Sequence, residues 1–180
     1  MRPIHAMPLV AAVLLAACGS SADQDGDGAI SNEEAAAAMG NAVQPQPGQY
    51  RVSTNVIEFD VPGLGDEMKQ QMKTMMSASA SQENTFCLTP EEAAKNGPEE
   101  MVKSMAEGNC TFRKFDVSGG NISADMQCTD EAGRVGTVLM EGNMSNSSSD
   151  MTMTMDQEVQ GMGQMHMKMN VKSERIGDCA

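Results

Sequence analysis

The stretch that decides the fold is Met165-His166-Met167-Lys168-Met169-Asn170-Val171, near the end of the 180-residue chain. Apolar and polar side chains alternate along it with a period of two, the pattern of a β-strand with one buried face. The same alternation occurs at 138–144 and 151–155, and polar or glycine-containing turns are expected at 146–149 and 157–164. Turns at these places would set Met155 opposite Met140 and Met165 opposite Met155. The three stretches therefore predict an antiparallel meander with one methionine face.

The segments upstream predict more strands and several short helices. Residues 50–61 are rich in β-branched side chains and predict a strand that bends near Val56, where the alternation changes phase. A shorter strand is expected at 85–88. Helices are expected at 33–39, at 66–78 with its methionines on one side, after the capping box Thr89-Pro90-Glu91-Glu92, and at 98–106. The predicted fold class is mainly β with short helices (α+β), the meander forming a sandwich or half-barrel.

The four cysteines that follow Cys18 predict two disulfides. Cys110 and Cys128 lie at equal distances from Gly119, at the centre of a predicted hairpin with a glycine turn. They would therefore face each other across the hairpin, which leaves Cys87 to pair with Cys179. The cysteine spacing matches no zinc or redox motif.

Residues 23–34 resemble the twelve-residue calcium loop of the EF-hand family at each diagnostic position. The ligands expected for one calcium ion are Asp23, Asp25, Asp27, Ala29 through its carbonyl, Ser31, and Glu34 as a bidentate ligand. The loop lacks an incoming helix, and a single loop leaves Ile30 without a paired β-segment, so the expected affinity is weak, on the order of 10⁻⁴–10⁻³ M. The alternative is an acidic spacer that only matches the motif. Because a linker with Pro45 and Pro47 follows, calcium is expected to order this segment without changing the β domain.

The start of the chain predicts export. A weakly basic start and a short apolar run at 7–17 fit a secretory signal, and the run is too short to span a bilayer. The ending Leu15-Ala16-Ala17-Cys18 resembles a bacterial lipobox, which makes Cys18 the lipidated first residue of the mature protein; the alternative is an ordinary cleaved signal. Gly19 then favours the outer membrane of a Gram-negative-type envelope, facing the periplasm.

These features divide the chain into four parts. A signal peptide at 1–17 precedes a lipidated N-terminus with the calcium loop and a short helix at 18–40, a linker at 41–48 and a β-rich domain at 49–179. The formal net charge of −13 argues against nucleic acid as a partner, since phosphates demand a basic surface. The expected partner is the membrane, through the lipid anchor, while a protein partner or small ligand stays open.

Several motifs within 45–179 resemble one family of exported bacterial proteins, many of them lipoproteins, that is classed as a domain of unknown function. The motifs are Pro47-Gly48-Gln49-Tyr50, Pro62-Gly63, Phe86-Cys87-Leu88-Thr89-Pro90-Glu91, Cys110, Cys128, the methionine strands, and Arg175-Ile176-Gly177-Asp178-Cys179. The resemblance implies a small β-rich envelope domain and no established activity.

Three kinds of function remain open. The first is a calcium-binding structural or binding protein of the envelope. The second is a carrier of a small apolar ligand. The third is Cu(I) binding by thioethers, which are soft ligands, at Met151, Met153, Met155, Met165, Met167 and Met169. A plain hydrophobic face explains these methionines more simply. An enzyme is not expected, because His166 is the only histidine after the signal and no nucleophile or phosphate-loop motif occurs.

Overall fold

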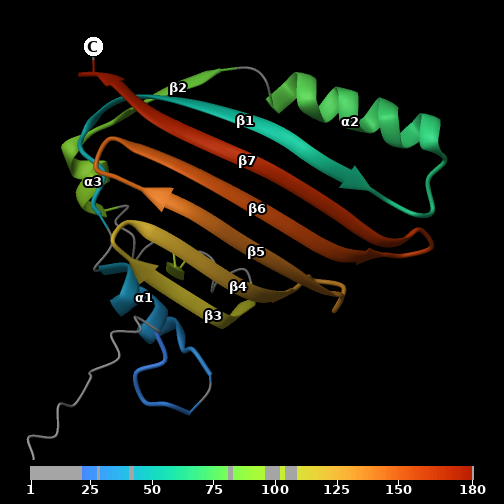
Figure 1. The fold of residues 1–180 in the computed structure, drawn as a ribbon, viewed down its shortest axis with the longest axis horizontal. Helices are drawn as coiled ribbons and strands as arrows, with labels where there is room; N and C mark the ends of the chain where they lie inside the picture. Colours follow the sequence, from blue (N-terminus) through green and yellow to red (C-terminus); the bar gives the residue numbers. More distant parts are fainter. Residues whose placement is uncertain are drawn as a thin grey trace, which may run out of the picture.

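A single antiparallel sheet dominates the computed structural model, which describes residues 22–27, 29–40, 43–80, 83–95, 102–103 and 109–179. The seven strands lie in the order β2-β1-β7-β6-β5-β4-β3 and form an open, curved sheet (Figure 1). The elements in chain order are α1 (Asn32–Gly40), β1 (Gly48–Asp60), α2 (Asp66–Ala80), β2 (Asn84–Leu88), α3 (Pro90–Lys95), β3 (Cys110–Ser118), β4 (Asn121–Thr129), β5 (Val135–Met144), β6 (Ser148–Val159) and β7 (Gly163–Gly177). The predicted fold class is confirmed.

The methionine meander is confirmed in its faces but not in its register. Met140 of β5 lies opposite Met153, not Met155, and Met155 of β6 lies opposite Met167, not Met165. Both pairings differ from the prediction by two residues. Because side chains alternate with a period of two, a shift of two leaves every methionine on its predicted face.

The turns explain this register. Between β5 and β6, the main-chain N–H of Ser145 donates to the carbonyl of Ser148 at 2.7 Å, which closes the chain sooner than the predicted turn. Between β6 and β7, Gly161 and Gly163 have φ angles of 78° and 84°, a region that glycine enters without strain. The positions of these tight turns set which residues face each other.

The best-buried core lies where α1 packs against β3, not at the centre of the methionine face. Its buried members are Ala22, Ala35, Met39, Val102, Phe112, Phe115, Val117, Ile122, Ala124, Met126 and Met140. Phe112 and Phe115 meet edge to face with ring centroids 5.1 Å apart. The N-terminal segment and the sheet thus share one core. The linker therefore does not separate the two parts, which was the ground for expecting calcium to leave the β domain unchanged.

The predicted bend in β1 is confirmed as a shift in pairing between Val56 and Glu58. β2 pairs only with the first part of β1, and α2 packs beside the remainder (Figure 1). The Lys73 ammonium donates to the carbonyl of Ile57 at 3.0 Å, and Lys69 pairs with Asp60 at 2.7 Å. Covering the edge of a sheet in this way limits its pairing with other chains.

The helix predicted at 66–78 is confirmed as α2, but its methionine side is not buried. Met68, Met72 and Met75 are 50%, 38% and 65% exposed. Of the helix predicted at 98–106, only Val102 and Lys103 lie within the described residues, and both are helical.

Both predicted disulfides are confirmed. Cys110 is bonded to Cys128 and lies opposite it in the β3–β4 ladder. Cys87 is bonded to Cys179, which connects β2 to the end of the chain. The capping box before α3 is also confirmed, since the Thr89 N–H and the Glu92 carboxylate are 2.9 Å apart.

His166 joins three strands on the polar face of the sheet. Its Nδ1 lies 2.8 Å from Asp156 on β6, and its Nε2 lies 3.3 Å from Glu58 on β1. The hydrogen bond to Asp156, more than any other contact, raises the pKa of His166 above its ordinary value. A raised folded-state pKa gives stability that is fully present below the unfolded pKa of about 6.5 and is lost as the pH rises through the folded value.

We therefore expect the stability difference between the wild type and His166→Asn to shrink between about pH 5.5 and pH 8. Urea unfolding at a series of pH values measures it. Lys172→Gln, which removes the 2.9 Å ion pair to Asp150 on the same face, is the control. Its effect should stay level over this range, because this ion pair contains no histidine. A constant difference for His166→Asn would contradict the prediction.

Candidate functional site

The acidic loop is held in place by the start of α1. The Ser31 hydroxyl accepts from the Glu34 N–H at 3.2 Å, and the Ser31 N–H donates to the Glu34 carboxylate at 2.9 Å. This reciprocal pair is a capping box, which satisfies amide groups at the first turn of a helix. The sequence Ser31-Asn32-Glu33-Glu34 thus starts the helix and fixes the end of the loop.

Three carboxylates gather inside the loop. Asp23, Asp25 and Asp27 each have an oxygen within 4.8 Å of the other two. Each also accepts a main-chain N–H through Oδ1, from Gly26, Asp27 and Ala29 respectively, at 2.8–3.1 Å. These bonds fold the loop around the carboxylates. Calcium binds six to eight oxygens, including aspartate carboxylates and backbone carbonyls, so the chemistry of this group fits that ion.

Glu34 is not a member of this three-carboxylate cluster. Its carboxylate also accepts the Gln24 N–H at 2.9 Å. Hydrogen bonds from Ser31, first of all from its main chain, and from Gln24 lower the pKa of Glu34 to about 2. Glu34 is therefore ionised under ordinary conditions and lies beside the start of the loop. To bind calcium through both oxygens, the Glu34 carboxylate would have to give up its hydrogen bond from the Gln24 N–H.

The loop is attached to the sheet by main-chain contacts. Ile30 forms an antiparallel bridge with Phe112 of β3. The N–H of Ala22 donates to the carbonyl of Phe115 at 3.1 Å. In Figure 1 the loop, in blue, lies below β3 and α1. The expectation that Ile30 would lack a paired segment is therefore wrong, because the edge strand of the sheet supplies one.

Several predicted features lie outside the described part of the chain: the signal peptide at 1–17, the expected lipidation site Cys18, Gly19, and Gly28 at the sixth position of the loop. No helix among the described residues is long and apolar enough to cross a membrane.

The structure brings the six methionines of the Cu(I) hypothesis onto one face of β6 and β7. Met153 lies opposite Met169 and Met155 opposite Met167, while Met165 lies opposite Gln157. All six are partly exposed. Paired positions place side chains within contact of each other. The same arrangement of methionines would form either a hydrophobic face or a thioether site for Cu(I), so copper binding stays a hypothesis.

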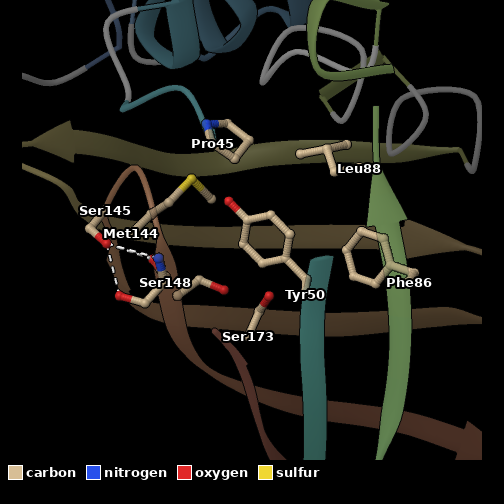
Figure 2. A pocket seen from close by; sticks show the side chains of 9 residues that line it. Pro45, Tyr50, Phe86, Leu88, Met144, Ser145, Ser148 and Ser173 are labelled. Atoms are coloured by element: carbon tan, nitrogen blue, oxygen red, sulfur yellow. Dashed lines mark hydrogen bonds between the residues drawn. The ribbon is translucent and has the colours of Figure 1, made fainter. Parts of the chain in front are cut away.

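An apolar pocket lies at the end of the sheet where β1 begins, and the sequence did not predict it. Its volume is about 220 Å³. Figure 2 shows the rings of Tyr50 and Phe86 on one side, and Pro45, Leu88 and Met144 around them. Its remaining lining residues are serines of the β5–β6 turn and of β6 and β7. Of these serines, the sequence placed Ser148 and Ser149 in a predicted turn and gave no role to Ser145 or Ser173.

The fold and the disulfides define a class: a disulfide-stabilised, open antiparallel sheet with an acidic loop attached at one edge. Over residues 45–179 the chain matches the family described as "Protein of unknown function (DUF3617)", and it belongs to that family. The expected resemblance to a domain-of-unknown-function family is thus confirmed over the expected residues. No curated protein and no solved structure matches the chain.

Proposed function

We propose that this chain is a lipid-anchored protein of a Gram-negative-type cell envelope that binds one calcium ion at 23–34 and has a structural or binding role, not an enzymatic one. The observation that supports calcium binding best is the convergence of Asp23, Asp25 and Asp27 within 4.8 Å. Three carboxylates so close repel one another unless a cation lies between them. The attachment of Ile30 to Phe112 supports a stable loop geometry.

The proposed anchor would hold the loop close to lipid headgroups. Ala22 is hydrogen-bonded to Phe115 of β3 through its main chain. It follows Cys18 by four residues, so the two are at most about 14 Å apart along the chain. A lipid on Cys18 would therefore bring the β3 edge and the acidic loop to the membrane surface. Loss of Arg2 with residues 1–17 would leave the anchored chain one charge more negative than the −13 of the full sequence. Calcium in the loop would reduce repulsion between this chain and anionic headgroups.

Calcium binding is tested by titration calorimetry of an unacylated Cys18→Ser version. We expect one site with a dissociation constant on the order of 10⁻⁴–10⁻³ M. Glu34→Gln should weaken binding because it removes an oxygen of the bidentate ligand, while glutamine preserves the capping box. Glu33→Gln is the matched control: it removes the same charge from the adjacent position of α1 and should bind like the wild type.

Calcium should also stabilise the whole sheet, because the loop shares the core of the sheet. At a calcium concentration ten times the dissociation constant, binding to the folded state contributes about 1.4 kcal/mol. No heat at millimolar calcium, or equal binding by Glu34→Gln and the wild type, would mean that the loop is only an acidic spacer that matches the motif.

The lipid anchor is tested by Cys18→Ser in the full chain. The wild type should incorporate labelled palmitate and fractionate with membranes, whereas Cys18→Ser should lose the label and become soluble. The physical reason is that acyl chains supply about 0.8 kcal/mol of membrane affinity for each buried methylene. A wild type that takes up no palmitate, with a mutant that stays on membranes, would contradict the anchor.

A second candidate is a carrier of a small apolar ligand. The methionine face of β6 and β7 is only partly covered by the described residues, and methionine adapts its shape to varied ligands. This observation favours the carrier over Cu(I) sequestration, because Met151 and Met153 pack against the hydrophobic core and are continuous with it.

A further inference from the structure

We propose that the pocket beside Tyr50 binds a small neutral aromatic molecule that carries one hydrogen-bonding group. The proposal rests on the carrier candidate and gives it a site and a ligand class. It does not depend on calcium, because the pocket shares no residue with the loop.

The size of the pocket limits the ligand. An apolar cavity of about 150 Å³ is enough to hold benzene. The 220 Å³ here therefore fits one substituted ring and is smaller than the sites of drug-sized ligands, which usually exceed about 300 Å³.

The aromatic wall favours a ring over an alkyl chain. Tyr50 and Phe86 are stacked, with centroids 5.6 Å apart and ring planes 16° from parallel. Tyr50 is 4% exposed, but Phe86 is 45% exposed although it is large and apolar. Aromatic rings gain free energy from offset or edge contacts with a further ring beyond the burial of area. A ligand ring in the pocket would cover apolar surface that water now contacts.

Two serines supply the polar end. Ser149 of β6 and Ser173 of β7 lie opposite each other at the end of the methionine face. Within the described residues, neither side-chain hydroxyl has a hydrogen-bond partner. Figure 2 shows the Ser173 hydroxyl on the pocket side of its strand. The Tyr50 hydroxyl is already satisfied, since it lies 2.8 Å from the carbonyl of Gln46. The serines are therefore the hydrogen-bonding groups left for a ligand.

The lining also excludes a charged ligand. Besides Tyr50, whose pKa burial raises further, the pocket is lined by proline, phenylalanine, leucine, methionine and serine. The charge of Arg175 acts on the Tyr50 hydroxyl, but its guanidinium is already paired with Asp178. An ion placed in the pocket would therefore lose hydration without gaining an unpaired opposite charge. A neutral ring with a hydroxyl or amide group meets all of these conditions.

Tyr50 provides a specific reporter, because the chain has one tyrosine and no tryptophan. The experiment uses the full chain carrying Cys18→Ser and isotope-labelled tyrosine, titrated with benzyl alcohol while the ring signals of Tyr50 are followed by NMR. We expect a saturable shift. Toluene, which lacks the hydroxyl, should bind several-fold more weakly, as should 1-hexanol, which lacks the ring.

Two variants locate the site. Ser173→Leu fills the pocket and should weaken benzyl alcohol binding by about tenfold or more. Ser53→Leu is the matched control: Ser53 lies on neighbouring β1, opposite Lys172 and on the other face of the sheet, and its change should have no effect. Ser173→Ala keeps the pocket open but should reduce the preference for benzyl alcohol over toluene.

Three results would overturn the proposal: no saturable shift of Tyr50, equal binding by Ser173→Leu, or tighter binding of 1-hexanol than of benzyl alcohol. Saturation transfer from the methionine methyl groups distinguishes binding in the pocket from binding on the methionine face. Transfer to benzyl alcohol without a Tyr50 shift would sink the pocket while supporting a carrier that uses the methionine face. Transfer to none of the probes would sink both.

Discussion

Replacing both Cys87 and Cys179 with alanine is expected to lower the free energy of unfolding by about 4–5 kcal/mol. The two residues are 92 positions apart, and a disulfide restricts the unfolded chain more as the loop it closes becomes longer. In the native state the bond connects β2 to the end of the chain after β7. β2 pairs only with residues 48–52 of β1. Removal of the disulfide should therefore also let β2 detach locally. Urea unfolding under non-reducing conditions measures the global loss, and amide exchange measures the local one.

The double alanine variant of Cys110 and Cys128 is the control. These residues are 18 positions apart, so the expected loss is smaller, about 3 kcal/mol. They also lie within a ladder of nine-residue strands that stays paired without them. A greater loss for this pair than for Cys87 and Cys179 would contradict the argument from loop length.

The second large effect is expected for Phe115→Ala, at about 3–5 kcal/mol. Phe115 is 1% exposed and lies in the core where α1 packs against β3, so removing its ring leaves a cavity. The carbonyl of Phe115 also accepts a hydrogen bond from the N–H of Ala22. A cavity at Phe115 should therefore loosen the N-terminal segment. We therefore expect weaker calcium binding as well as a lower urea midpoint.

Phe86→Ala is the matched control for Phe115→Ala. The same ring is removed at the opposite edge of the sheet, from a side chain that is 45% exposed. The expected cost is about 1 kcal/mol, largely from the lost stack with Tyr50. Calcium affinity should not change. Equal losses for the two variants would mean that α1 does not share its core with β3.

Local sequence patterns predicted the features that depend on few residues. Alternation with a period of two identified the methionine strands, and a change of phase located the irregularity near Val56. The central glycine turn of the β3–β4 hairpin predicted the pairing of Cys110 with Cys128, and elimination then left Cys87 with Cys179. The spacing of carboxylates at 23–27 predicted their convergence around one point.

The register of the meander needed more than periodicity. Pairings that differ by two residues place the same side chains on the same face, so the burial pattern cannot distinguish them. The hydrogen bond from Ser145 to Ser148 and the positive φ angles of Gly161 and Gly163 decide between them. Several turn geometries fit such glycine-rich and serine-rich segments, which is why the predicted register was wrong by two residues at both turns.

The sequence by itself thus determined the β class, the methionine face, both disulfides and the acidic loop, because each follows from periodicity or turn chemistry over a short span. Only the tertiary structure decided that α1 docks on β3, that Ile30 pairs with Phe112, and that the methionines of α2 stay exposed. It alone also formed the pocket, whose walls come from segments between Pro45 and Ser173. The physical reason is that such contacts depend on which surfaces of distant segments meet. An amphipathic pattern indicates that a face is apolar, but it does not specify what will cover that face.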